Sequence, residues 1–363
     1  MKTVQVILPG RSYDILIDPG LLAEVPRLLR DRRTARRLFL VSNPVVHELY
    51  GETLMKGLAE SGFRVSEILI PDGEARKTLR TVERIYGKLV SGGADRSSAL
   101  VALGGGVTGD IAGFAAATFM RGIPYIQIPT SVVAQVDSSV GGKTGVNYGL
   151  AKNMVGSFWQ PSLVCIDPGT LLSLPRREYQ SGLYEVFKYG LIRDAEFFDW
   201  LNASLEEIQA RKALVMQQLI RRCCQIKAEV TAQDERESDL RRILNLGHTF
   251  GHGLESAVRF RGVTHGEAIA YGMMAAAHLS HWRTGLSRES RDRAVQSIRE
   301  IGPLPTIDTV PTSRVVEAMK RDKKRRNQRT VVVLLAAIGI TEIRDDIPDQ
   351  DLARAWDQVK QLN

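Results

Sequence analysis

The chain has 363 residues, enough for two domains, and its 44% hydrophobic and 25% charged residues are ordinary for a folded soluble enzyme. Its formal net charge of +8 comes from two short runs: residues 27–37 carry +5 and residues 320–329 carry +6, which leaves −3 elsewhere. No aromatic residues interleave with either run, as stacking on bases requires, so the charge argues against a nucleic-acid partner.

The first 170 or so residues alternate short apolar strands with helices. Strands are predicted at residues 3–8, 14–17, 37–42, 64–70, 99–103, 125–129 and 163–166, and helices between some of them at 45–61 and 78–91. This alternation predicts a mostly parallel sheet that is covered on both faces. The late apolar run at residues 331–340 is too short to span a bilayer, so it predicts a buried strand and no membrane partner.

From about residue 178 the strand pattern gives way to amphipathic helices, predicted at residues 179–192, 195–200, 214–231, 248–258 and 265–284. We therefore expect an α/β domain at residues 1–177 with a Rossmann-like, mostly parallel sheet, and an all-α domain at residues 178–363. The three cysteines, Cys165, Cys223 and Cys224, give neither a disulfide framework nor a CxxC site, which fits a reducing cytoplasm.

Three of the six histidines lie within eighteen positions, together with a glutamate. His248 and His252 are four residues apart, so on a helix they share one face, and Glu255 extends the same stripe. With His265 nearby, the pattern suggests a metal bound by two histidines and a carboxylate, with one position open for chemistry. Histidines that only pack or cap helices are the alternative, and the spacing alone does not choose between the liganding positions.

The glycine-rich segment Gly104–Asp110 follows a predicted strand and opens a helix, which satisfies G-x-G-x-x-G in the context where a pyrophosphate approaches backbone N–H groups. It is not on the first strand, and the segment about 20 residues later has no acid for a ribose hydroxyl. We therefore expect a dinucleotide that is bound in a way other than the standard Rossmann one. A turn that serves packing alone is the alternative.

Two further groups of polar residues suit an anionic small molecule. The turn Gly141–Thr144 resembles the end of a P-loop but lacks its first glycine, so Walker A fails, while a lysine after glycines still suits phosphate or polyol oxygens. Glu185 and Lys188 are three apart in an otherwise apolar helix, and a buried carboxylate needs a metal or a cation. Exposed lysines and a surface ion pair are the alternative interpretations.

Taken together and in this order, these segments resemble the 3-dehydroquinate synthase family of the sugar-phosphate cyclase superfamily. The resemblance covers essentially the whole chain, through Asp72–Glu74 with Lys77, Gly104–Asp110, Arg121, Pro129–Gly156, Glu185–Lys188, Cys223–Glu237, Leu244–Glu255, His265–Glu267 and Asp322–Lys324. It implies an N-terminal α/β domain that binds NAD in an atypical way and a C-terminal domain that binds metal.

The resemblance also implies an activity. It is a carbon–oxygen lyase step of the shikimate pathway, which leads to chorismate and the aromatic amino acids, and it turns 3-deoxy-D-arabino-heptulosonate 7-phosphate into 3-dehydroquinate and phosphate. The implied route is transient oxidation by NAD, phosphate elimination, re-reduction, ring opening and aldol closure. Zinc or cobalt, a small sugar-phosphate substrate and a homodimer are implied as well. The rivals are another cyclase, of the 2-deoxy-scyllo-inosose or 2-epi-5-epi-valiolone synthase type, and a metal-dependent polyol dehydrogenase.

Site residues follow from the same resemblance, position by position. The implied metal ligands are Glu185, His248 and His265, and the implied catalytic residues are His252, Lys188, Lys227, Glu237 and Asn245. The implied NAD contacts are Asp72, Glu74, Lys77, Gly105, Gly106, Val107, Asp110, Thr130, Ser131, Lys143, Lys152, Thr170 and Ser173. The implied substrate contacts are Arg121, Asp137, Lys143, Asn153, Arg241 and a lysine of the Lys323–Lys324 pair, assigned to Lys324.

Overall fold

The structure is a computed structural model that describes residues 1–361 except 34, 150, 238, 260 and 321–329. The chain forms two compact units: unit 1 is Met1–Leu174 with Ala213–Arg236, and unit 2 is Pro175–Lys212 with Glu237–Asn363. We expected one boundary, between residues 177 and 178. The structure differs in returning residues 213–236 to unit 1, because helix α9 (Ala213–Gln233) packs against the first two strands.

A sheet forms the centre of unit 1, and the described residues place seven strands in it, in the order β1-β2-β9-β6-β5-β3-β4. Its strands are β1 (Lys2–Val6), β2 (Tyr13–Ile17), β3 (Arg37–Ser42), β4 (Arg64–Leu69), β5 (Ala99–Gly104), β6 (Tyr125–Pro129) and β9 (Leu163–Ile166). Only β1 and β2 pair antiparallel among these strands, and the other neighbours pair parallel. The predicted, mostly parallel sheet is confirmed.

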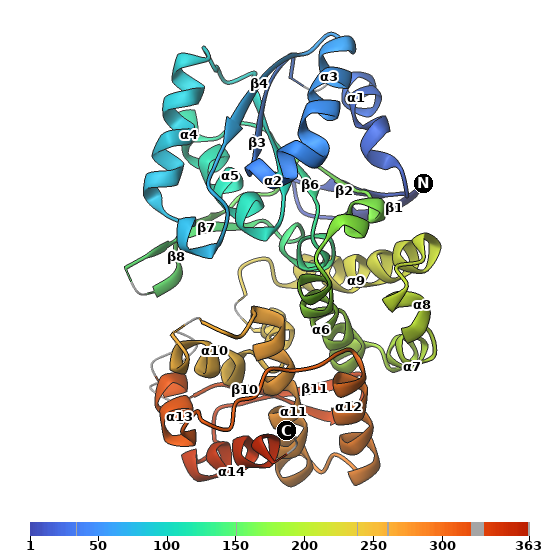
Figure 1. Cartoon of the computed structure of the whole chain (residues 1–363), viewed down its shortest axis with the longest axis vertical. Helices are drawn as coiled ribbons and strands as arrows, with labels where there is room; N and C mark the ends of the chain where they lie inside the picture. Colours follow the sequence, from blue (N-terminus) through green and yellow to red (C-terminus); the bar gives the residue numbers. More distant parts are fainter. Residues whose placement is uncertain (34, 150, 238, 260, 321–329, 362–363) are drawn as a thin grey trace. The chain divides into compact units, whose positions relative to one another are not determined.

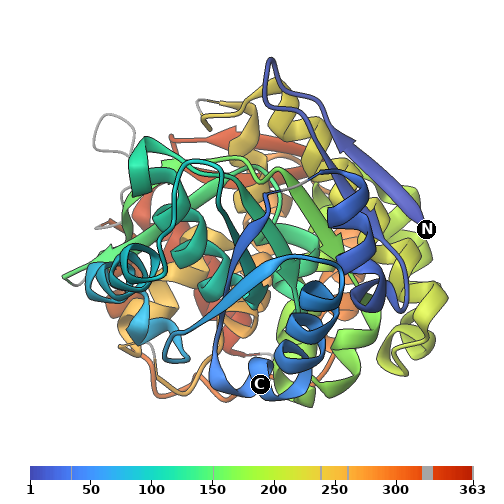
Figure 2. The same cartoon turned by 90° about the horizontal axis from the view of Figure 1, so that it is seen from above.

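Helices cover both faces of this sheet. Side chains along a strand alternate between the two faces, so neighbouring residues of one strand contact different helices. Leu38 and Leu40 of β3 pack with α1 (Leu21–Asp31) and α3 (Glu52–Glu60), while Phe39 and Val41 pack with α4 (Leu79–Ser91) and α5 (Gly106–Thr118). Figures 1 and 2 show the blue helices α1 and α3 on one side of the sheet and the cyan helix α4 on the other.

The other elements of unit 1 connect the strands and carry much of the candidate site. They are α2 (Pro44–Val46), η1 (His47–Gly51), η2 (Glu74–Arg76), η3 (Phe119–Arg121), η4 (Ala134–Ser138), η5 (Pro168–Ser173) and a hairpin of β7 (Lys143–Tyr148) and β8 (Ala151–Phe158). We expected only a glycine-rich turn where this hairpin begins. Glycine, lysine and asparagine disfavour strands, which is why the sequence pattern did not predict it.

Unit 2 is mainly helical, as expected. Its elements are α6 (Arg176–Arg193), α7 (Ala195–Ala203), α8 (Leu205–Gln209), η6 (Leu240–Asn245), α10 (His248–Ala257), α11 (His265–Arg283), α12 (Arg288–Glu300), α13 (Thr312–Lys320), α14 (Asp349–Lys360), β10 (Val332–Ala337) and β11 (Ile340–Arg344). The hairpin β10–β11 corrects the all-α expectation, and its first strand lies in the apolar run at residues 331–340. None of the helices described is long and apolar enough to cross a membrane.

Helix α11 is the centre of unit 2. Most of its residues are buried, and α6, α10, α12, α14 and β10 pack around it. Burial on all sides explains why its apolar residues do not form a single stripe. The helices α6 and α10 therefore contact a common, largely buried neighbour.

Candidate active site

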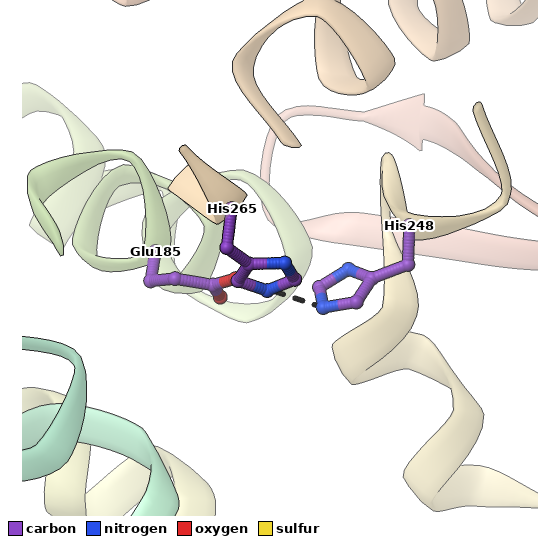
Figure 3. Close-up of side chains that lie close together, drawn as sticks. All are labelled: Glu185, His248 and His265. Carbon is purple, nitrogen blue, oxygen red and sulfur yellow. Dashed lines mark ion pairs between the residues drawn. The ribbon is translucent and has the colours of Figure 1, made fainter. Parts of the chain in front are cut away.

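Three helices of unit 2 bring together the carboxylate and imidazoles that the sequence singled out. Glu185 comes from the middle of α6, whereas His248 and His265 are the first residues of α10 and α11. One ligand atom of each lies within 4.8 Å of the others, and Figure 3 shows the three side chains pointing toward one another. Nε2 of His248 and Nε2 of His265 lie 3.6 and 3.4 Å from Oε1 of Glu185.

The two oxygens of Glu185 face different partners. Oε2 forms an ion pair with Lys188, one turn further along α6, and Oε1 faces the two imidazoles. Glu185 is 0% exposed and Lys188 1% exposed, and a buried charge is tolerated only beside opposite charge or a metal. A carboxylate oxygen with two imidazole nitrogens is a donor set that suits zinc or cobalt, so these residues fit such an ion.

His248 is turned toward Glu185 by its backbone. Gly247, just before α10, has φ 78°, a conformation that favours glycine. Nδ1 of His248 lies 3.2 Å from the carbonyl oxygen of Leu246, so Nδ1–H can donate to it and Nε2 remains directed at Oε1 of Glu185. A metal-binding histidine is commonly held through its other ring nitrogen in this way.

The sequence His265-Gly-Glu267 fixes the start of α11, where His265 lies. A Cβ at Gly266 would lie 1.8 Å from the carbonyl oxygen of Ser181, so only glycine lets α11 approach α6 one turn before Glu185. Glu267 completes a capping box with Thr264 at the start of α11. It also accepts hydrogen bonds of 2.7 and 2.8 Å from the guanidinium of Arg177.

A second group of ligand atoms lies beside the first. His252, Glu255 and His265 also bring one such atom each within 4.8 Å, and Nδ1 of His265 lies 3.5 Å from Oε1 of Glu255. Burial lowers the pKa of His265, but the carboxylates of Glu185 and Glu255 outweigh it and raise the pKa to about 9. The His248–His252 stripe seen in the sequence thus contributes one histidine to each group.

In unit 1, the residues expected to bind the cofactor follow the carboxyl ends of parallel strands. Asp72 and Glu74 follow β4, Gly105 follows β5, Thr130 and Ser131 follow β6, and Thr170 follows β9. The chain leaves β3 toward β4 on one side and returns to β5 on the other. Ligands of open α/β sheets bind at such a point, where the strand order reverses.

The glycine-rich turn lies at this point, between the end of β5 and the start of α5. A Cβ at Gly106 would lie 3.0 Å from Oγ of Ser138, and one at Gly105 would lie 3.4 Å from Oγ of Ser131. Glycines therefore let the start of α5 pack closely against these two serines, and backbone N–H groups at a helix N-terminus suit a pyrophosphate. The turn is thus central in the sheet although it does not follow the first strand.

A hydrogen-bond network in unit 1 joins residues that the sequence assigned separately. Nζ of Lys77, which is 4% exposed, lies 2.5 Å from both Oδ2 of Asp110 and Oδ1 of Asn153. Asn147 donates to Oε1 of Glu74 and accepts from the backbone N–H of Asn153, each over 2.8 Å. Burial raises the pKa of Asp110, and Lys77 opposes the shift.

Asn147 was missed by sequence reasoning. It lies on β7, a strand that was not predicted, so no pattern placed it beside Glu74 or Asn153. Tyr50 was also missed, because the residues that it contacts are distant in the sequence. Its hydroxyl lies 2.7 Å from Oγ of Ser173 and 3.1 Å from the carbonyl oxygen of Thr170.

Two more pairs of predicted residues meet within a unit. Lys227 on α9 donates to the carbonyl oxygen of Asp137, over 2.7 Å, and to its carboxylate. In unit 2, Nδ2 of Asn245 donates to Oε1 of Glu237 over 2.7 Å.

The remaining predicted residues have these places. Val107 is in the first turn of α5, Arg121 ends η3 with φ 67°, Lys143 begins β7, Lys152 is in β8, and Arg241 is buried in η6. Lys323 and Lys324 lie outside the described residues.

Comparison with known proteins identifies similar sequences along nearly the whole chain. The model of the 3-dehydroquinate synthase N-terminal family matches residues 67–181, and that of the 3-dehydroquinate synthase C-terminal family matches residues 182–325. A 3-dehydroquinate synthase from Syntrophotalea carbinolica is 45% identical over 360 residues, which are 99% of each chain. The resemblance drawn from the motifs is confirmed.

Two solved structures of cyclases are similar in fold. A 2-epi-5-epi-valiolone synthase from Streptomyces hygroscopicus with NAD+ and Zn2+ bound has a TM-score of 0.89 and 29% identity, and the match covers 100% of this chain and 99% of that one. A 2-deoxy-scyllo-inosose synthase complexed with carbaglucose-6-phosphate, NAD+ and Co2+ has a TM-score of 0.90 and 26% identity, with 98% and 100% covered.

Proposed function

The chain belongs to the 3-dehydroquinate synthase family, and on this premise we propose that it converts 3-deoxy-D-arabino-heptulosonate 7-phosphate to 3-dehydroquinate and phosphate. This is a carbon–oxygen lyase reaction, the second step of the shikimate pathway. The observation that carries the proposal is the group of Glu185, His248 and His265, in which Glu185 and His248 are buried, held beside Lys188 in a chain so similar to curated 3-dehydroquinate synthases.

We propose that this group holds one zinc or cobalt ion and that the turn at Gly105–Gly106, with Lys77 and Asp110, holds NAD. The NAD+ and Zn2+ or Co2+ bound in the two related cyclases support both assignments. When bound, the metal would supply stabilisation of developing negative charge and NAD would supply reversible hydride transfer, so no net oxidation would result.

The protein's own residues orient these groups and handle protons. Lys188 holds Oε2 of Glu185 and so keeps Oε1 directed at the two imidazoles. His252 lies one turn from His248, with ring centroids 5.5 Å apart, and its proposed role is to move a proton at the substrate. Glu237 and Asn245, joined by a hydrogen bond, are proposed to act as one polar unit in the same chemistry.

The basic residues are proposed to bind the anionic substrate. Arginine and lysine suit a phosphate and a carboxylate, and we assign Arg121, Lys143, Arg241 and Lys324 to these contacts, together with the neutral amide of Asn153. Lys143 is also assigned to NAD, together with Lys152. Lys227 and Asp137 form an ion pair, so we propose that substrate meets them as a unit with a fixed hydrogen-bond pattern.

We also propose a homodimer in the cytoplasm. The dimer rests on the family resemblance, and the cytoplasmic location is supported by the three cysteines, which are buried and form no disulfide among the described residues. Light scattering of the purified protein tests the dimer.

The decisive assay measures phosphate release from the heptulosonate phosphate with and without added NAD. We expect release to require NAD and a divalent metal, to stop after treatment with a chelator and to return with zinc or cobalt. Absorbance at the NADH band must stay flat during turnover. NADH that accumulates in step with product would identify a polyol dehydrogenase instead, and turnover of other sugar phosphates alone would identify a related cyclase.

A further inference from the structure

The imidazole of His265 lies between two carboxylates from different helices. Its Nε2 lies 3.4 Å from Oε1 of Glu185 on α6, and its Nδ1 lies 3.5 Å from Oε1 of Glu255 on α10. Glu255 is 4% exposed, and it follows His248 by about two turns of the same helix. The mechanism described above uses Glu185 and leaves Glu255 without a role.

A neutral imidazole binds a metal through one nitrogen and carries its proton on the other. At His265, Nε2 is the nitrogen that shares Oε1 of Glu185 with Nε2 of His248. Nδ1 is therefore the nitrogen that keeps the proton, and the oxygen beside it belongs to Glu255. We propose that Glu255 is a positioning residue: it accepts the Nδ1–H hydrogen bond of His265 and so fixes the tautomer and the ring plane that present Nε2 to the metal.

The two histidines are held in different ways. Nδ1 of His248 faces a neutral acceptor, the carbonyl oxygen of Leu246, at 3.2 Å. Nδ1 of His265 faces a carboxylate, which makes an imidazole a more basic ligand. His265 is also the more exposed of the two, with 40% of its side chain accessible against 11% for His248. The ring with less packing around it is thus the one that a charged acceptor restrains.

The same glutamate belongs to the group of His252, Glu255 and His265, which could itself bind a metal. The burial of Glu185 favours the positioning role. Glu185 is 0% exposed and directs Oε1 at two imidazole nitrogens, which is the more enclosed of the two carboxylate sites. A metal bound directly to Glu255 is therefore an outcome that the experiment must be able to detect.

The inference rests on the proposed metal site, so the parent protein is measured first. Zinc affinity is determined by competition with a chelating indicator, and the ligand field is read from the visible spectrum of the cobalt-loaded protein. The variants are Glu255→Gln, Glu185→Gln and Glu267→Gln. The last is a matched control: Glu267 is also 4% exposed and lies two residues from His265, and glutamine at that position keeps the capping box.

We expect Glu255→Gln to weaken zinc binding by about 10–100-fold, the usual cost of losing such a partner of a metal-bound histidine, and to shift the cobalt spectrum. Glu185→Gln should weaken binding much further. Glu267→Gln keeps the capping box but loses the charge paired with Arg177, so it should weaken zinc binding less than Glu255→Gln does and leave the cobalt spectrum unchanged. Zinc affinity in Glu255→Gln that equals the parent's, or that falls only as far as in Glu267→Gln, overturns the inference. A loss as large as in Glu185→Gln identifies Glu255 as a ligand and overturns it too. A parent that binds no metal defeats the proposed function itself.

Discussion

The ammonium group of Lys77 lies 2.5 Å from the amide oxygen of Asn153, so a residue assigned to the cofactor holds one assigned to the substrate. Asn153 has φ 53°, an uncommon backbone conformation. Its backbone N–H donates to the side-chain oxygen of Asn147. We expect Lys77→Met to weaken NAD binding and also to raise KM for the substrate, because the side chain of Asn153 loses the hydrogen bond from Lys77. Calorimetry with NAD and initial-rate kinetics check both. A variant with weaker NAD binding but an unchanged KM would separate the two residues.

Lys152 and Arg121 should lose activity for different reasons. Lys152 is assigned to NAD and Arg121 to the substrate, so Lys152→Ala should weaken NAD binding while Arg121→Ala leaves it nearly intact. Titration of NAD into both purified variants gives the answer. Equal weakening in the two would contradict the assignment of these residues to different ligands.

His248 and His252 belong to different ligand groups, and metal analysis separates them. His248→Ala removes one of three donors, so metal affinity should fall by orders of magnitude and all activity should be lost. His252→Ala should keep nearly full metal occupancy, with at most about a tenfold loss of affinity, and lose about 10²–10⁴-fold in rate. A metal-free His252→Ala beside a loaded His248→Ala would place the ion among His252, Glu255 and His265 instead.

Gly266 should not tolerate a methyl group. In Gly266→Ala the new Cβ would meet the carbonyl oxygen of Ser181 at 1.8 Å, so α11 must move away from α6 and carry His265 away from Glu185. We expect a loss of unfolding free energy of about 1–3 kcal/mol or more together with weaker zinc binding. Gly87 is the control, since it is also within a helix and a Cβ there meets nothing within 4 Å. Gly87→Ala should be neutral or slightly stabilising in a chemical denaturation series.

His278 should make the fold less stable in acid. It is 8% exposed, and neither ring nitrogen has a hydrogen-bond partner among the described residues. Burial, and then the charge of Arg291, lower its pKa from 6.5. As pH falls through 6.5 the unfolded chain takes up a proton that the folded protein does not, so the free energy of unfolding decreases. His278→Gln should remove this part of the decrease. Urea denaturation of parent and variant between about pH 7.5 and 5.5 measures it, and parallel curves would exclude this role.

The sequence predicted the fold well where hydrophobic period and length agree. The strand at residues 37–42 and the helix beginning at His265 were predicted at their observed starts, because both combine a long buried run with clear flanking residues. The hairpin β7–β8 was not predicted, because its stability comes from packing under α5 rather than from strand propensity.

For the site, the spacing of His248 and His252 correctly indicated a shared face, but it could not assign the two histidines to different groups. That assignment depends on the approach of α6 and α11, which joins positions distant in the chain. Asn147 and Glu255 are similar cases, since each gains its role from a neighbour on another element. Patterns in a single sequence reveal the local spacing of apolar and polar residues. Contacts between distant elements produce no such spacing, so the sequence alone does not predict them.

The close approach of α6 and α11 at Gly266 also bears on whether folding or metal binding comes first. Glu185 is far in the chain from His248 and His265, and the three residues meet where α6, α10 and α11 pack together. Such nonlocal contacts form late, because loop-closure entropy must be overcome before they contribute. We therefore expect the proposed ion to enter a site that folding has already built, unlike a zinc finger, whose chain stays unfolded without metal. Apoprotein made during zinc starvation should keep its helical content and regain activity on later metal supply, without renewed synthesis.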